Sequence, residues 1–108
     1  MLPVFDIARP ATVADAVALL DDDHIPYWGG TELLLAMKMG LLTPQCLVDL
    51  KHVASLRDIR CDDDSLVIGA GATHDEIATS ALVAAVAPLL ADIEARVGNA
   101  RVRGQGTI

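Results

Sequence analysis

The fold is decided by the stretch Ile25-Pro-Tyr-Trp-Gly-Gly-Thr-Glu-Leu-Leu-Leu-Ala-Met-Lys-Met-Gly40. It predicts a short strand at Ile25–Trp28, a turn at Gly29-Gly30, and a helix over Thr31–Met39 that ends at Gly40. Paired glycines let a ligand approach the backbone closely, and a following helix points unpaired N–H groups and its positive dipole end at the turn. Such a junction suits a phosphate or pyrophosphate. The same arrangement also occurs in ligand-free βα units, where the glycines only shape the turn.

Composition sets broad limits on the class of protein. The chain has 108 residues, 53% of them hydrophobic, which is enough for a packed core in one domain or part of one. No apolar run approaches the roughly 18 residues that span a bilayer, and the start of the chain lacks the features of a secretory signal. We therefore expect a cytoplasmic protein without membrane insertion. A net charge of −7 without a basic stripe argues against nucleic-acid binding.

The segments beside the opening stretch extend its pattern. Thr12-Val-Ala-Asp15 predicts a capping box and a helix that ends near Asp22. Cys46–Leu50 predicts a second apolar strand, so that strand, helix and strand form a parallel βαβ unit. The residues expected to face the core from the two helices are Val13, Ala16, Val17, Leu20, Leu34, Leu35 and Met39.

The pattern changes after Lys51. Asp58–Cys61 and Leu66–Gly69 predict a hairpin around an acidic turn. Thr73-His-Asp-Glu76 then predicts a second capping box, at the start of a helix over residues 74–80.

A longer helix is predicted over Leu82–Arg96. Pro88 is either tolerated near its first turns or divides it in two. Gly98-Asn99 is expected to end this helix, and Arg101–Ile108 to be a loop entering a strand. The apolar side of the helix is expected to carry Val86, Leu89, Leu90 and Ile93.

The side chains indicate little catalytic or metal chemistry. The three histidines lie far apart in sequence, and the two cysteines fit no disulfide, zinc or iron–sulfur spacing. We interpret His74 as a surface residue in a first helical turn. Glu32 is either a general base or, more simply, an acid that satisfies a helix dipole or a nearby N–H group. We therefore expect neither a catalytic residue nor a metal site in this chain.

Backbone chemistry remains, in three glycine-rich turns that each carry a hydroxyl. These turns are Gly29-Gly-Thr31, Gly69-Ala-Gly-Ala-Thr73 and Gly104-Gln-Gly-Thr107. Their composition favours one extended, phosphate-bearing cofactor on which all three converge.

Five segments carry a more specific signal through their order and spacing. They are Phe5–Leu20, Trp28-Gly-Gly-Thr-Glu-Leu-Leu34, Leu47-Val-Asp-Leu-Lys51, Ile68-Gly-Ala-Gly-Ala-Thr73 and Val97-Gly-Asn-Ala-Arg-Val-Arg-Gly-Gln-Gly-Thr-Ile108. Together they resemble the flavin subunit of the molybdenum hydroxylases, the xanthine dehydrogenase and carbon monoxide dehydrogenase family. Trp28 departs from that pattern, which has a small residue there, and either fills the core or stacks on the cofactor.

The resemblance implies an α+β, PCMH-type FAD-binding fold that holds FAD between two subdomains. Residues 1–55 would form the first, βαβ subdomain, and residues 56–108 the start of the second. It also implies two partners, a large molybdopterin-binding subunit and a small subunit with 2Fe-2S clusters. The FAD of this subunit would take electrons from those clusters and pass them to an acceptor.

The resemblance also implies which residues would bind FAD. Backbone N–H groups of one continuous segment would hold the diphosphate, with a hydroxyl added by Thr31. That segment consists of Tyr27, Trp28, Gly29, Gly30, Thr31, Glu32 and Leu33. Thr73 would line the same site, Val97 would lie on its flavin side, and Gly106, Thr107 and Ile108 would begin a second phosphate loop.

The chain ends before the glycine pair that completes the second motif in that family, so we expect an incomplete FAD-binding domain. One alternative is a truncated, non-catalytic segment that binds no FAD and at most serves as an assembly surface. Another is a small phosphate-binding βαβ module unrelated to flavin, which leaves the downstream segments unexplained. The substrate, the electron acceptor and the stoichiometry do not follow from the sequence.

Overall fold

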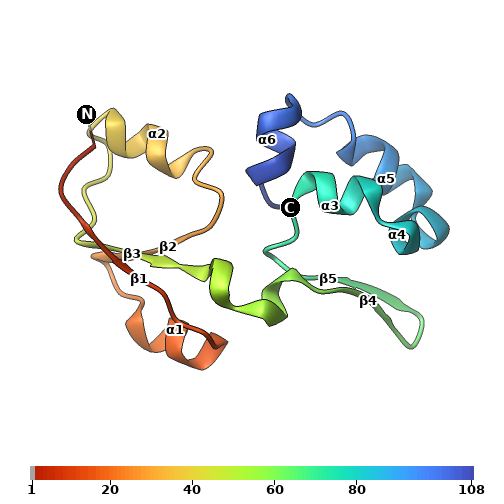
Figure 1. Cartoon of the computed structure of the whole chain (residues 1–108), viewed down its shortest axis with the longest axis horizontal. Helices are drawn as coiled ribbons and strands as arrows, with labels where there is room; N and C mark the ends of the chain where they lie inside the picture. Colours follow the sequence, from red (N-terminus) through yellow and green to blue (C-terminus); the bar gives the residue numbers. More distant parts are fainter. Residues whose placement is uncertain (1) are drawn as a thin grey trace. The chain divides into compact units, whose positions relative to one another are not determined.

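The computed structural model describes residues 2–108, and they divide into two compact units (Figure 1). The first unit ends at Ser55, and the second comprises Leu56–Ile108. Each unit contains both helices and strands, so the α+β class expected from the sequence is confirmed.

The first unit is built on a three-stranded parallel sheet with the strand order β1-β3-β2. The strands are β1 (Asp6–Ala8), β2 (His24–Tyr27) and β3 (Cys46–Asp49). The central strand β3 is buried along its whole length, as its apolar composition predicts, and its Leu47 is in register with Ile7 and Ile25. The parallel strand–helix–strand unit expected around the glycine turn is therefore confirmed.

Two short α-helices and two 3₁₀ helices complete this part of the chain. They are α1 (Val13–Leu19), α2 (Leu33–Lys38), η1 (Leu50–His52) and η2 (Ala54–Arg57), the last of which crosses the boundary between the units. The hydroxyl of Thr12 caps α1 by accepting the N–H of Asp15 at 3.1 Å, which is one half of the predicted capping box, and α1 ends at Leu19 rather than near Asp22. Helix α2 begins at Leu33, two residues later than predicted, because Thr31 remains in the turn and Glu32 makes no capping hydrogen bond.

The inner faces of α1 and α2 differ from the prediction. Ala16 in α1 and Met37 in α2 are buried. Four residues that were expected to face the core are exposed instead, namely Val13, Val17, Leu35 and Met39. Helices of seven and six residues make fewer than about two turns, so each places only a narrow stripe against the sheet.

The second unit begins with the predicted hairpin. Strand β4 (Ile59–Asp62) pairs antiparallel with β5 (Ser65–Ile68). Asp63 lies in the turn with φ +52, a left-handed conformation that aspartate tolerates better than most residues.

Four helices follow the hairpin, namely α3 (His74–Thr79), α4 (Ala81–Val86), α5 (Pro88–Glu94) and α6 (Ala100–Gln105). The capping box at Thr73 is confirmed, because Thr73 and Glu76 each accept the other's backbone N–H. Pro88 occupies the first turn of α5 and divides the long predicted helix in two. In the described part of the chain, no helix has the length and apolarity needed to cross a membrane.

The loop predicted for the tail is wrong, because residues 100–105 form α6. The side chain of Asn99 accepts the N–H of Val102 at 3.1 Å and caps this helix. Helix α5 already ends at Glu94, so Gly98-Asn99 does not end it as predicted, and Asn99 instead begins the next helix. The expected strand amounts to an isolated antiparallel bridge between Thr107 and Thr73.

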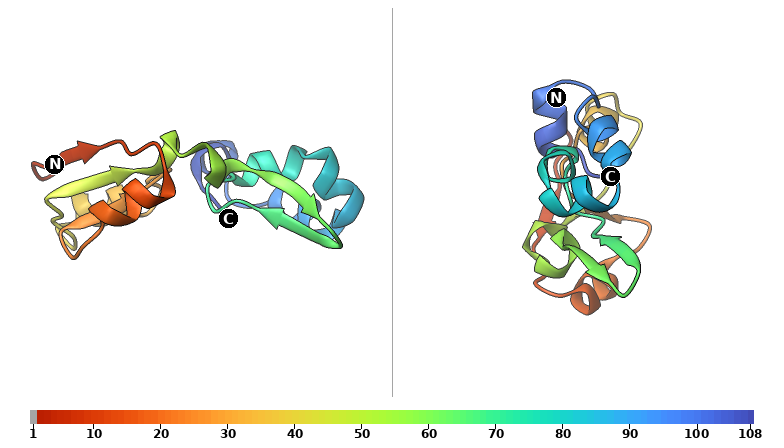
Figure 2. Two further views of the ribbon diagram at one scale, coloured as in Figure 1. Left: turned by 90° about the horizontal axis from the view of Figure 1, so that it is seen from below. Right: turned by 90° about the vertical axis from the view of Figure 1, so that its right-hand side faces the viewer.

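The core of the second unit consists of Ala72, Ile77, Val83 and Ala91, against which Ile59, Leu66, Ile68 and Leu90 pack. Helices α3, α4 and α5 lie on one side of the hairpin (Figure 2). Three residues expected on the apolar side are exposed instead, namely Val86, Leu89 and Ile93. The break at Pro88 restarts the helical phase, so α5 places Leu90, Ala91 and Glu94 inward.

Candidate functional site

The glycine turn joins the end of β2 to the start of α2. Gly30 has φ +70, a left-handed conformation that favours glycine. A Cβ on Gly30 would lie 2.8 Å from Cε2 of Tyr27 and 2.9 Å from Cδ1 of Leu34. Because the backbone and these neighbours together account for the glycine, its presence alone does not indicate a ligand.

The hydrogen bonds of this turn are more informative. Among residues 2–108, no partner accepts the backbone N–H groups of residues 29–33, and the helical pattern begins only where Leu34 donates to the Gly30 carbonyl at 3.2 Å. Thr31 and Glu32 are exposed, and the paired glycines are half-buried. Consecutive free N–H groups in a turn form a concave set of donors that suits an anion. Helix α2 has only six residues, so its dipole adds less than the sequence suggested.

The other two glycine-rich segments use their glycine N–H groups within the chain. Gly69 donates to the Asp58 carbonyl at 2.6 Å, and Gly71 donates to the Leu56 carbonyl at 2.7 Å. Gly106 donates to Val102 at 2.6 Å. Only the turn at residues 29–33 therefore presents a run of free donors among the three segments that the sequence singled out.

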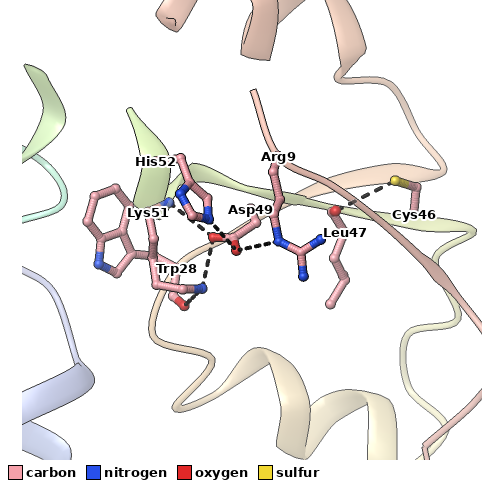
Figure 3. Close-up of polar contacts among 7 residues, drawn as sticks. All are labelled: Arg9, Trp28, Cys46, Leu47, Asp49, Lys51 and His52. Atoms are coloured by element: carbon pink, nitrogen blue, oxygen red, sulfur yellow. Dashed lines mark hydrogen bonds and ion pairs between the residues drawn. The ribbon is translucent and has the colours of Figure 1, made fainter. Parts of the chain in front are cut away.

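A charged cluster lies at the end of β3 (Figure 3). Asp49 is buried, and its Oδ1 accepts the backbone N–H of Lys51 at 3.0 Å and lies 2.8 Å from the Lys51 ammonium. The same ammonium donates to the carbonyl of Trp28 at 3.2 Å and lies 3.9 Å from the centre of the Tyr27 ring. The cluster thus connects β3 to the first residues of the glycine turn.

The electrostatics of the cluster keep Asp49 ionised. Burial by itself would raise the pKa of Asp49, but hydrogen bonds from the Lys51 side chain and backbone, and the charges of Lys51 and His52, outweigh it. The pKa of Asp49 therefore lies below its ordinary value. Arg9 Nε and His52 Nε2 each lie 3.9 Å from Asp49 Oδ2, the carboxylate oxygen that Lys51 does not contact.

The second unit holds the remaining predicted site residues. Thr73 and Thr107 are brought together by their bridge, beside which the backbone N–H of His74 donates to the Gly106 carbonyl at 2.9 Å. Ile108, at the edge of the bridge, is exposed. Val97 is separate from the bridge, and its carbonyl accepts a hydrogen bond from Arg103 at 3.2 Å. The bridge and the glycine turn belong to different units.

Two interpretations of individual side chains need correction. His74 is not a surface residue, because its side chain is mostly buried and its Nδ1 is hydrogen-bonded to the buried Glu94. Glu32 precedes α2 and caps no N–H group there, so that part of its interpretation is wrong, whereas its interaction with the helix dipole stays a prediction. Among the described residues, no three potential metal ligands gather at one place.

The contacts of Asp49 and Lys51 beside the glycine turn are a feature that the sequence reasoning missed. The available signal was a carboxylate at the end of an apolar strand, Leu47-Val-Asp49, followed two residues later by a lysine. An acid that ends a buried strand needs a partner, and a nearby cation supplies one.

Comparisons with known proteins give the family. A family model described as the FAD binding domain in molybdopterin dehydrogenase matches residues 3–108. The carbon monoxide dehydrogenase medium chain of Afipia carboxidovorans is 38% identical over 107 residues, covering 96% of this chain and 37% of that one. The carbon monoxide dehydrogenase medium chain of Hydrogenophaga pseudoflava is 36% identical over 109 residues, covering 98% of this chain and 38% of that one. A crystal structure of the cyanide-inactivated Cu,Mo-CO dehydrogenase matches with a TM-score of 0.95 at 38% identity, and the match covers 100% of this chain and 39% of the chain in that structure.

The chain belongs to the family of FAD-binding domains of molybdopterin dehydrogenases. Within it, the chain is similar to carbon monoxide dehydrogenase medium chains in both sequence and fold. It spans between 37% and 39% of the length of these three proteins. The predicted family and its FAD-binding fold are therefore confirmed, whereas the individual site residues stay a prediction.

Proposed function

We propose that this chain is a flavin-binding, electron-transfer component of a molybdenum hydroxylase-type oxidoreductase. Family membership supports FAD as the cofactor. The observation that carries the proposal is the run of free N–H groups at residues 29–33, because a diphosphate needs such donors and no residue in the described part of the chain accepts them.

The residues of the glycine turn fit a diphosphate. Tyr27 to Leu33 would hold it through the backbone, and the exposed Thr31 would add its hydroxyl. Gly30 allows the turn to adopt a left-handed conformation that other residues rarely take, and its missing side chain lets a ligand approach the backbone donors closely. Glu32 is exposed and acidic, and it would contribute its backbone rather than its carboxylate.

The second unit would supply further contacts. Thr73, Val97, Gly106, Thr107 and Ile108 would contribute to FAD binding, and the bridge between Thr73 and Thr107 fixes part of their backbone. The Thr73 hydroxyl already accepts the Glu76 N–H, so its capacity for a ligand is reduced. We propose that residues 1–55 are the first subdomain of the family's PCMH-type domain and residues 56–108 the start of the second.

FAD supplies the redox chemistry when it is bound, and the residues of the chain bind and orient it. For this reason we propose no catalytic side chain. We also propose that the chain works in the cytoplasm with two partners, a large subunit carrying molybdopterin and a small subunit carrying 2Fe-2S clusters. The names of the relatives support the partnership with a molybdenum-containing subunit, since they are medium chains of a dehydrogenase and one structure is of a Cu,Mo enzyme.

The test is the flavin content of the purified protein, together with any chains that it retains. We expect flavin absorbance, and FAD fluorescence once the protein is denatured. A colourless protein that also fails to take up added FAD would contradict the proposal and favour a non-catalytic assembly surface. Binding of pyrophosphate in such a protein would instead favour a general phosphate-binding module.

A further inference from the structure

We propose that Lys51 is a positioning residue for the glycine turn. Asp49 holds the Lys51 ammonium, and the ammonium holds the carbonyl of Trp28 at the start of the turn. We call the set of Tyr27, Trp28, Asp49 and Lys51 the lysine clamp. Its importance for FAD rests on the proposed function, whereas its effect on the turn is a property of the chain alone.

One ammonium group contacts the other three residues of the clamp. The Lys51 Nζ atom lies 2.8 Å from Asp49 Oδ1, 3.2 Å from the Trp28 carbonyl oxygen and 3.9 Å from the centre of the Tyr27 ring. Asp49 ends β3, whereas Tyr27 ends β2 and Trp28 begins the turn. Lys51 therefore ties the central strand to the point where the chain leaves the sheet (Figure 3).

The geometry of the peptide bond carries this restraint into the turn. The Trp28 carbonyl and the Gly29 N–H belong to one planar trans peptide, so they point in opposite directions. A hydrogen bond that fixes the carbonyl thereby fixes the direction of the first free N–H group of the turn. The next two residues are glycines, which lose the most conformational freedom on ordering, so an anchor just before them has a large effect.

Asp49 keeps the ammonium in place. The residue is 5% exposed, so its carboxylate needs a cation partner, and Lys51 also gives it a backbone N–H. Arg9 and His52 face the second carboxylate oxygen at 3.9 Å and leave the first to Lys51. The Lys51 side chain is 36% exposed, so water competes only in part for the same ammonium.

The chain offers a matched control for a test, because Lys38 is the only other lysine in the sequence. Lys38 is exposed at the end of α2. The test compares the wild type with Lys51→Met, Lys51→Gln, Lys51→Arg and Lys38→Met. Each protein is purified with any partner chains that it retains, and its flavin is then removed. Binding of FAD and of ADP is measured by titration, since ADP carries the diphosphate without the flavin ring.

We expect Lys51→Met and Lys51→Gln to weaken both FAD and ADP binding by about tenfold, the loss typical of one charge-assisted hydrogen bond. Lys51→Arg should restore most of the affinity, because a guanidinium can reach a carboxylate and a carbonyl while lying on an aromatic ring. Lys38→Met should bind like the wild type. Wild-type affinity in Lys51→Met, or a loss that Lys51→Arg does not reduce, would overturn the proposal.

A second measurement separates the clamp from the proposed function. Without FAD, the ¹⁵N order parameters of selectively labelled Gly29 and Gly30 should fall from about 0.85 to below about 0.6 in Lys51→Gln. They should stay unchanged in Lys38→Met. If the wild type binds no FAD, the proposed function fails and this result alone decides on the clamp. Unchanged order parameters in Lys51→Gln would overturn it.

Discussion

His74 in α3 and Glu94 in α5 form a hydrogen-bonded pair across 20 residues of sequence, between Nδ1 of the imidazole and Oε2 of the carboxylate. Glu94 is buried on the inner side of α5. The imidazole also packs against the segment after α6, because a Cβ on Gly106 would lie 3.1 Å from Cδ2 of His74. The pair therefore joins α3 and α5 beside the bridge at Thr107.

Removing this carboxylate should destabilise the second unit. Glu94→Ala leaves a mostly buried imidazole without its partner, and we expect a loss of about 1–3 kcal/mol in the free energy of unfolding. Asp92→Ala is the matched control, since Asp92 forms an exposed pair with Arg96 at 3.2 Å and such pairs contribute about 0.2–1 kcal/mol. Urea unfolding of both variants measures the difference, and equal losses would contradict a structural role for Glu94.

Acid should weaken the first unit through Asp49. The pKa of Asp49 is lowered in the folded chain, so its contribution is complete above its unfolded pKa and is lost as the pH falls through the folded one. The free energy of unfolding should therefore decrease below about pH 4, the ordinary range of an aspartate. Asp49→Asn should cost about 1.5–3 kcal/mol near neutral pH and flatten this acid limb. Urea unfolding from about pH 2 to neutral pH brackets the titration of an aspartate and tests both effects. If Asp49→Asn lost stability in acid as steeply as the wild type, the ionised Asp49 carboxylate would not stabilise the first unit.

Alanine at two glycines separates backbone strain from crowding. Gly30 and Gly40 have similar left-handed φ angles, +70 and +74. Nothing lies within 4 Å of a Cβ at Gly40, so Gly40→Ala should cost only the backbone strain, about 1–2 kcal/mol. Gly30→Ala also meets Tyr27 at 2.8 Å and Leu34 at 2.9 Å, which should add about 1–3 kcal/mol. Unfolding midpoints in urea give the comparison, and equal midpoints would mean that the turn relaxes freely.

Sequence reasoning succeeded where a structure depends on neighbouring residues. The capping box at Thr73 and the hairpin over 59–68 are each specified within a few positions, and each is present. The helix break at Pro88 is one of the two outcomes that the sequence left open. It failed on the faces of short helices. Leu35 and Met37 are both apolar, and the packing of α2 against the rest of the unit, rather than its periodicity, buries Met37 and exposes Leu35.

The candidate site shows the same division. The glycine turn is visible in the sequence because paired glycines precede a helical pattern. The clamp is not, since the Lys51 ammonium reaches a carbonyl 23 residues earlier in the chain. Likewise, no local spacing indicates that Glu94 faces His74. Contacts of this kind require the topology of the chain, which short motifs do not specify.

Alanine at Gly104 and at Gly106 should change stability in opposite directions. Gly104 lies in α6 with open space around a new Cβ, so Gly104→Ala should raise the free energy of unfolding by roughly 0.5–1 kcal/mol through a better helical propensity. Gly106 ends the same helix with an ordinary φ of −65°, but a Cβ there would lie 2.9 Å from the Val102 carbonyl oxygen and 3.1 Å from the His74 ring. Gly106→Ala should therefore lower the free energy of unfolding by about 1–3 kcal/mol. Thermal unfolding of the two variants checks the signs, and a stabilising Gly106→Ala would show that the contact between His74 and the tail is loose.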